Sequence, residues 1–157
     1  MRAVAPVGQI LEGVRVSRVV DGDTVRVRLG EEDVPVRLIG LDTPETVKPD
    51  APVECFGPEA SDYARAMLDG QQVVLEFDDT QGRRDRYDRV LAYVWRVLPD
   101  GSLRLFNEEV VASGHGVERQ YGVRPYAWRD ALVGAQEAAR QSGLGLWDAC
   151  GIDGGEP

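Results

Sequence analysis

Lysine and histidine are nearly absent from this chain. Lys48 is the only lysine among its 18 basic residues, and His115 is its only histidine. The formal net charge of -9 argues against a protein that coats nucleic acid by bulk electrostatics, because such affinity needs many cations on phosphates. Any polyanionic partner must be held locally. Arginines crowd into residues 81–89, QGRRDRYDR, which suits bidentate phosphate binding, although a compositional bias of the source genome would give the same excess.

Cysteine is scarce as well. The two cysteines, Cys55 and Cys150, lie neither in a CxxC pair nor near the histidine, which argues against a zinc or redox motif. Two interpretations remain open. They are two unrelated buried thiols, or they form one disulfide that closes a loop of about 95 residues, which the chain-entropy model values at about 4 to 5 kcal/mol. A disulfide would indicate an oxidising compartment.

Long apolar runs are also missing. None approaches the roughly 18 residues of a membrane span, and MRAVAPVGQI at the N-terminus holds no signal-peptide core. We therefore expect a soluble chain without membrane partners, from which a leader could have been removed. A length of 157 residues with 43% hydrophobic content suits one compact core. We expect a monomer, because nothing in the sequence suggests an apolar patch.

The first part of the chain predicts β-structure. Val25, Val27 and Leu29 alternate with Arg26 and Arg28, and this period of two is typical of a half-buried strand. The whole segment 9–40 predicts three antiparallel strands joined by tight turns. Residues 41–57 contain several prolines and no periodicity. They predict a long loop, and long loops inside compact domains tend to be functional.

The rest of the chain predicts helices around two further strands. An apolar stripe over 57–70 predicts an amphipathic helix, with Pro58 near its start. Asn107 is a good N-cap residue and predicts the start of a short helix. The remaining predicted elements are strands over 72–78 and 89–97 and a helix over about 127–141.

This order of elements predicts an α+β, β-rich fold. Five short strands, with a helix after the third and helices at the end, are typical of a five-stranded OB-fold barrel with three α-helices. We expect this domain to span residues 9–150, after an N-terminal extension (1–8) and before a disordered tail (151–157). Small barrels and α+β sandwiches share the same order, so the chemistry must be argued from a site.

Two short acidic motifs flank the predicted strands. In DGDT, residues 21–24, Asp23 shares the parity of Val25 and Val27, and in DTPE, residues 42–45, Asp42 shares the parity of Gly40. Each motif alone is explained by turn chemistry. Together they place two carboxylates at the mouth of the barrel, near backbone carbonyls, which favours a hard cation such as Ca²⁺.

Three further residues extend this candidate site. Pro44 would direct Glu45 back beside the ion, and Arg37 and Arg89 each lie in or beside an apolar strand next to acidic residues. A solvent-facing strand arginine is the ordinary explanation for each. A phosphate held between an ion and a guanidinium would need an arginine at the same place.

The quoted segments, taken together, resemble the staphylococcal nuclease family, also called thermonucleases or micrococcal nucleases. The matching motifs run in family order from about residue 10 to 147: VVDGDTVRV, VRLIGLDTPE, GPEAS, DRYDRVLAYV, NEEVVASG and GLW. The resemblance implies a five-stranded OB barrel with three helices. It also implies a Ca²⁺-dependent hydrolase that cleaves DNA and RNA phosphodiesters by in-line attack of water and leaves 3′-phosphate ends.

The resemblance also implies a role for each matching residue. Asp23 and Asp42 would bind the ion through their carboxylates and Thr43 through its backbone carbonyl. Arg37 and Arg89 match phosphate-binding arginines, and Glu45 matches the catalytic glutamate, described as the general base. Around the substrate, the candidates are Arg86, Tyr87 and Tyr121.

Two further expectations follow from the resemblance. Cysteines at matching positions in bacterial relatives favour a Cys55–Cys150 disulfide, and with it a secreted or cell-envelope protein. The alternative function is a catalytically inactive module that binds nucleic acid or peptide. Such modules usually lack part of the Asp, Arg and Glu set, which this chain has in full.

Overall fold

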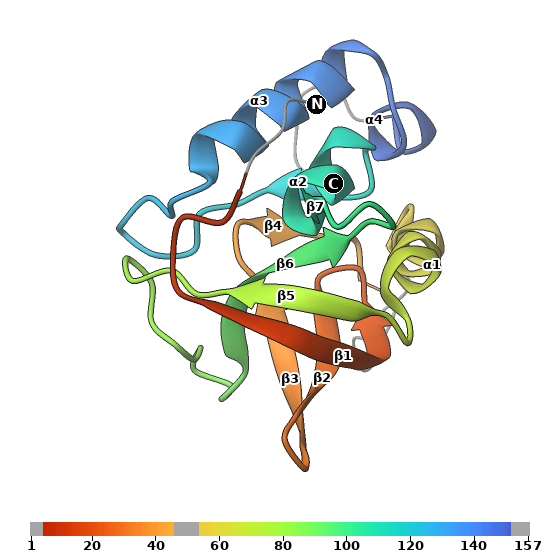
Figure 1. Ribbon diagram of the computed structural model, residues 1–157. Coiled ribbons are helices and arrows are strands. Elements are labelled where there is room, and N and C mark those ends of the chain that lie inside the picture. Colours follow the sequence, from red (N-terminus) through yellow and green to blue (C-terminus); the bar gives the residue numbers. More distant parts are fainter. Residues whose placement is uncertain (1–4, 46–53, 152–157) are drawn as a thin grey trace.

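The computed structural model describes residues 5–45 and 54–151, and Figure 1 shows a barrel with helices packed above it and one helix along its side. Its elements, in chain order, are β1 (Ile10–Asp21), β2 (Thr24–Leu29), β3 (Glu32–Leu38), β4 (Leu41–Asp42), α1 (Gly57–Leu68), β5 (Gln72–Glu76), β6 (Val90–Val97), β7 (Leu103–Leu105), α2 (Phe106–Ala112), β8 (Val117–Glu118), α3 (Arg129–Gln141) and α4 (Leu146–Ala149).

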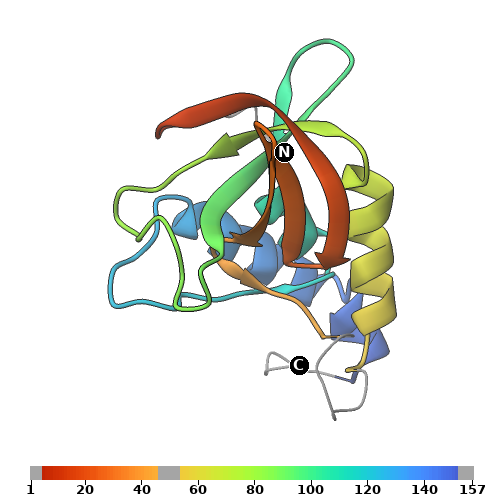
Figure 2. The ribbon, with the colours of Figure 1, turned by 90° about the horizontal axis from the view of Figure 1, so that it is seen from below.

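Five strands close the barrel, as the sequence predicts. The antiparallel pairs are β1 with β2, β2 with β3, β1 with β5, and β5 with β6. A parallel pairing of β3 with β6 closes the ring, while β7 extends β6 at the edge. The α+β, OB-type fold is therefore confirmed, and Figure 2 shows the curved sheet with α1 along one side.

The predicted alternation of burial is present in the barrel strands. Val25 and Val27 are fully buried on β2, while Arg28 on the same strand is exposed. The centre of the core is filled by aromatic side chains, among them Trp95, Tyr93 and Phe106. On α1, Ala60, Ala64 and Leu68 of the predicted stripe are buried, which holds the helix against the barrel.

The predicted N-cap role of Asn107 is wrong. Helix α2 begins at Phe106, with Leu105 in the capping position. Asn107 is instead completely buried, where its side chain accepts a hydrogen bond from the Val94 N–H at 2.9 Å and donates one to the Ile39 carbonyl at 2.8 Å. A buried amide with both partners satisfied fixes the relative position of β6 and the end of β3.

The predicted loop 41–57 is also wrong at its start, where β4 forms and pairs with β8. The short elements β7, β8 and α4 and the later start of α3 at Arg129 were not predicted.

In the N-terminal extension, the N–H groups of Val7 and Gly8 donate to the Glu76 carboxylate. The predicted disordered tail lies outside the described residues except for Gly151. None of the helices described here is long and apolar enough for a membrane span.

Candidate active site

The β1–β2 turn places Asp23 at the mouth of the barrel. Its side chain is nearly buried, and its two oxygens accept hydrogen bonds from the Thr24 hydroxyl and the Thr43 N–H, each at 3.1 Å. The bond to Thr43 connects the β1–β2 turn directly to β4. Asp23 and the segment after Asp42 therefore lie side by side, as the parity of the sequence predicts.

Two glycines fix the position of β4 and Thr43. Asp42 pairs with Val117 of β8, and a Cβ on the neighbouring Gly116 would lie only 2.9 Å from Thr43 Cγ2. On the other side, a Cβ on Gly22 would lie 2.9 Å from Thr43 Cβ. Thr43 is thus enclosed between two backbone segments that approach closely because both lack a side chain.

Arg37 on β3 points to both carboxylates. Its Nη2 lies 3.3 Å from Asp23 Oδ2 and 3.8 Å from Asp42 Oδ1. Its Nη1 donates to the carbonyls of Leu38 and Leu41 at 3.1 and 3.0 Å. With a side chain only 11% exposed, Arg37 is held in one orientation rather than free in solvent.

Arg89 lies beside Arg37 because of the parallel β3–β6 pairing. Arg37 is the register partner of Leu91, and Arg89 is two residues before Leu91, so both arginines occupy the same face of the sheet. Asp85 holds Arg89 through its Oδ2, 2.7 Å from Arg89 Nε, while its Oδ1 accepts the Arg89 N–H at 2.9 Å. Burial raises the pKa of Asp85, but the hydrogen bonds from Arg89 and Tyr87 lower it more, so the pKa is lowered overall.

Arg37 and Arg89 line a pocket of about 540 Å³. All five arginines and tyrosines predicted to contact phosphate or substrate line it, and the structure adds two more. The predicted ones are Arg37, Arg86, Tyr87, Arg89 and Tyr121, and the additions are Arg119 and Tyr126. The cluster 81–89 therefore contributes two arginines to the pocket. Its other two lie elsewhere, with Arg83 over the Phe77 ring and Arg84 paired with Asp88.

Tyr121 and Arg119 form one wall of the pocket. Arg37 Nη2 donates to the Tyr121 hydroxyl at 2.6 Å, and the Arg37 guanidinium lies 5.2 Å from the centre of the Tyr121 ring. Arg119 Nε lies 3.6 Å from Asp42 Oδ2. Arg119 was missed in the sequence because the segment GVERQYGV has no periodicity, and its place depends on the pairing of β8 with β4.

Tyr87, which also lines the pocket, lies close to two arginines. The guanidinium groups of Arg86 and Arg89 lie 5.0 and 5.3 Å from the centre of the Tyr87 ring. Tyr87 is 64% exposed, so much of its side chain is available to a planar ligand. An aromatic ring beside cations is the arrangement on which an unpaired base stacks.

Glu45 lies three residues after Asp42 and is partly buried. Its N–H donates to Glu54 Oε1 at 2.9 Å, and its carbonyl accepts the Glu54 N–H at 3.0 Å. Residues 46–53, between these two, lie outside the described part of the chain. Glu54 was not among the predicted site residues, since one glutamate in a proline-rich stretch carries no pattern.

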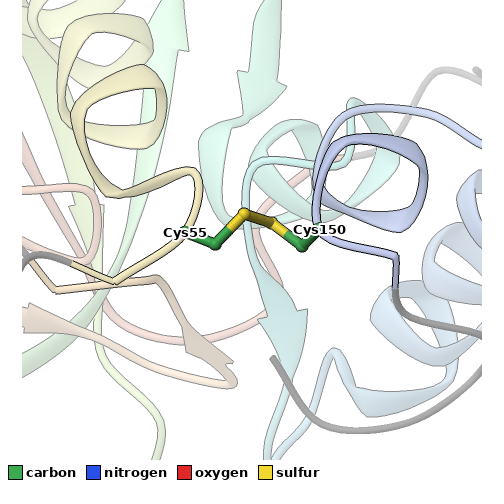
Figure 3. Close-up of a disulfide and its surroundings, with 2 residues drawn as sticks. All are labelled: Cys55 and Cys150. Atoms are coloured by element: carbon green, nitrogen blue, oxygen red, sulfur yellow. A yellow bond between two sulfur atoms is a disulfide. The ribbon is translucent and has the colours of Figure 1, made fainter.

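The two cysteines are bonded to each other. The Cys55–Cys150 disulfide joins the turn before α1 to the end of α4 (Figure 3), with the two Cα atoms 5.9 Å apart. The structure thus favours the disulfide interpretation over two separate thiols.

The mouth of the barrel offers oxygen ligands suited to a hard cation. The described residues include no cluster of three or more histidines, cysteines and carboxylates that could hold a metal, so the candidates are two carboxylates and a carbonyl. Burial and the charge of Asp23 raise the pKa of Asp42, against Arg119 and Arg37. The buried Thr43 hydroxyl has no hydrogen-bond partner. Two crowded carboxylates beside an unsatisfied oxygen fit a Ca²⁺-type ion.

Comparison with known proteins gives the family of the chain. The family model "Staphylococcal nuclease homologue" matches residues 35–149. The thermonuclease of Staphylococcus hyicus is 40% identical over 134 residues, which cover 85% of this chain and 74% of the relative. The chain belongs to the staphylococcal nuclease family.

Two further relatives with nuclease names are similar to the chain. The thermonuclease of Staphylococcus intermedius is 39% identical over 137 residues, or 87% of this chain and 77% of the relative. Endonuclease YncB of Bacillus subtilis is 40% identical over 85 residues, or 54% of this chain and 40% of the relative. Of the candidate catalytic and metal-binding residues, only Asp23 lies outside the range matched by the family model.

Proposed function

We propose that this chain is a Ca²⁺-dependent nuclease that hydrolyses phosphodiesters of DNA and RNA and leaves 3′-phosphate ends. The observation that carries the proposal is that Arg37 and Arg89 line one open pocket, and that Arg37 also pairs with both Asp23 and Asp42. These residues come from separate elements of the barrel. Relatives named thermonuclease and endonuclease support the nuclease activity.

Asp23 and Asp42 would hold the ion through their carboxylates and Thr43 through its carbonyl. The bound ion supplies positive charge that stabilises the phosphate oxygens as negative charge grows on them. The close approach of Gly22 and Gly116 to Thr43 keeps these ligands in register. The unpartnered Thr43 hydroxyl supplies a further oxygen beside them.

Arg37 and Arg89 would bind the scissile phosphate. A guanidinium donates two parallel hydrogen bonds to phosphate oxygens, and preoriented donors stabilise the transition state without reorganising. Here the orientation comes from Asp85 on Arg89 and from backbone carbonyls on Arg37. Glu45 would accept the proton of the attacking water, a contribution typically worth about 10² to 10⁴-fold in rate.

Tyr87, Tyr121 and Arg86 would contact the nucleotide beside the scissile phosphate. The pocket they line is of the size of a ligand site for a small organic molecule. Because the chain as a whole carries -9, we place most of the affinity for nucleic acid in this pocket. We further propose that the protein is a monomer. We also propose that it works outside the cytoplasm, because its disulfide would be stable in an oxidising compartment.

This function is tested by measuring cleavage of single-stranded DNA and of RNA, once with CaCl₂ and once with excess EGTA. We compare the parent, Glu45→Gln, and the matched control Glu31→Gln, whose carboxylate is exposed in the β2–β3 turn. We expect Ca²⁺-dependent cleavage that Glu45→Gln lowers by about 10² to 10⁴-fold and Glu31→Gln leaves unchanged. A parent without Ca²⁺-dependent cleavage would instead indicate a binding module.

A further inference from the structure

We propose that Glu54 and the Cys55–Cys150 disulfide together position Glu45, so that cleavage by this chain depends on the oxidation state of that disulfide. The inference rests on the proposed role of Glu45 in the nuclease reaction. Glu54 is a positioning residue in this proposal, because its side chain and its N–H both bond the backbone of Glu45, while its carbonyl accepts the Gly57 N–H at 2.9 Å.

Two hydrogen bonds join Glu45 and Glu54. The Glu54 side chain accepts the Glu45 N–H, and the Glu54 N–H donates to the Glu45 carbonyl. Both main-chain polar groups of Glu45 are therefore committed, which restricts its backbone and the direction of its side chain. Pro44, with its fixed φ, restricts the chain on the preceding side.

The two hydrogen bonds between Glu45 and Glu54 need a further anchor to hold their geometry. The Glu45–Glu54 side-chain bond is exposed to solvent, where water competes for both partners, so the bond alone holds the geometry weakly. The residue after Glu54 is Cys55, and its disulfide makes a covalent connection to Cys150. The disulfide therefore limits how far Glu54 can move from Glu45.

The other cysteine of the disulfide, Cys150, lies next to a partly buried helix. Cys150 follows α4, whose Leu146 and Trp147 are buried. The Leu146 N–H donates to the Gly114 carbonyl at 2.9 Å. Gly114 lies just before β8, the strand that pairs with β4. β4, just before Glu45, is thus tied to β8, and Cys55, just after Glu54, is bonded to Cys150 beside the helix that bonds Gly114. Figure 3 shows this disulfide.

The disulfide is also accessible to a reductant, since Cys55 is exposed and Cys150 is partly exposed. A dithiol would reduce it by thiol–disulfide exchange. The S–S bond breaks, Cys55 and Cys150 each become a thiol, and the dithiol is oxidised to its cyclic disulfide. After this exchange, only hydrogen bonds would hold Glu54 in place: the two with Glu45 and the one that its carbonyl accepts from the Gly57 N–H.

The test uses the full chain and single-stranded DNA with CaCl₂. We measure kcat and KM for the parent before and after reduction by dithiothreitol, and for Cys55→Ser/Cys150→Ser, Glu54→Ala and Glu54→Gln. The matched control is Asp100→Ala, which removes an exposed carboxylate that accepts the Ser102 N–H in the β6–β7 turn. Circular dichroism confirms that each sample is folded.

We expect reduction, the double cysteine variant and Glu54→Ala each to lower kcat by about 10 to 100-fold, the scale of a displaced catalytic group. KM should stay within about threefold, because Glu45 makes no contact that binds the ground state in this mechanism. Glu54→Gln should keep most of the activity, since its side-chain oxygen can still accept the Glu45 N–H. Asp100→Ala should match the parent.

Two results would overturn the inference while leaving the nuclease assignment intact. One is a reduced parent and a Glu54→Ala variant that both keep their kcat. The other is a Glu54→Gln variant as impaired as Glu54→Ala, which would mean that Glu54 acts by its charge. Amide hydrogen exchange of Glu45 gives a readout independent of cleavage. Exchange should accelerate on reduction, and unchanged exchange refutes the positioning even if the parent cleaves no substrate.

Discussion

Replacing Gly116 by alanine should slow cleavage about 10-fold and weaken Ca²⁺ binding while the barrel stays folded. The Cβ of the introduced alanine would lie 2.9 Å from Thr43 Cγ2 and 3.1 Å from both the Asp42 carbonyl oxygen and Val110 Cγ1. The backbone of Gly116 is not in the left-handed region, so alanine can adopt its conformation. The predicted effect is therefore steric.

The magnitude follows from how little the surroundings can yield. Ordinary contact between carbon atoms begins at about 3.5 Å, so β4 must move by roughly half an ångström. Thr43 is β-branched and buried, and the close approach of Gly22 blocks its retreat on the other side. A displacement of about 1 Å at a catalytic centre can cost 10²-fold, which makes about 10-fold the expectation here. Overpacking should also lower the free energy of unfolding by about 1 to 3 kcal/mol.

The assay combines steady-state cleavage of single-stranded DNA with a calorimetric Ca²⁺ titration. Gly134→Ala is the control, because Gly134 lies within α3 and a Cβ there would meet no atom within 4 Å. It should leave activity unchanged and raise the free energy of unfolding by about 0.4 to 1 kcal/mol. A Gly116→Ala variant that is less stable but keeps the parent's kcat and Ca²⁺ affinity would refute the reasoning.

Three further predictions concern neighbouring features. Asp85→Ala should lower kcat/KM by about 10 to 100-fold, because Arg89 loses the carboxylate that orients it; unchanged steady-state kinetics would contradict this. Burial raises the pKa of Asp78, but hydrogen bonds from Ala127, Thr80 and Tyr93 lower it overall. Asp78 thus stabilises the fold above its unfolded-state pKa, and the contribution is lost as pH falls through the lower folded-state value. Asp78→Asn should therefore cost about 2 kcal/mol at pH 7 and less in acid, as urea unfolding at both pH values would show. Fluorescence anisotropy should detect weak binding of metal-free protein to long DNA, and tight binding at moderate salt would contradict the net-charge argument.

Local patterns in the sequence predicted most of the barrel. The alternation of Val25 and Val27 with arginines gave the orientation of β2, and the same parity placed Asp23 at the mouth. Arg37 and Arg89 could be named individually, while their proximity depends on the parallel pairing of β3 with β6. That pairing joins strands far apart in the chain, and no local period encodes it.

The elements missed by the sequence analysis are those that exist only through tertiary contacts. The strands β4 and β8 have two residues each and form against one another. A pair so short has no period to detect, and the position of Arg119 was lost with it. Asn107 has the side chain of a good N-cap residue. In the structure its amide instead forms two buried hydrogen bonds, with Val94 of β6 and with Ile39 just after β3.

An acidic chain can still bind a polyanion because charge acts locally in salt. At physiological ionic strength, exposed charges separated by more than about 8 Å are largely screened, so a net charge of -9 spread over the surface opposes binding only weakly at the pocket. Within the pocket, Arg37, Arg86, Arg89 and Arg119 lie together. Arg37 and Arg119 also face Asp42, so a cation bound there would offset the carboxylate charge that these two guanidiniums otherwise face. On this argument, Ca²⁺ would strengthen the grip on phosphate as well as the chemistry.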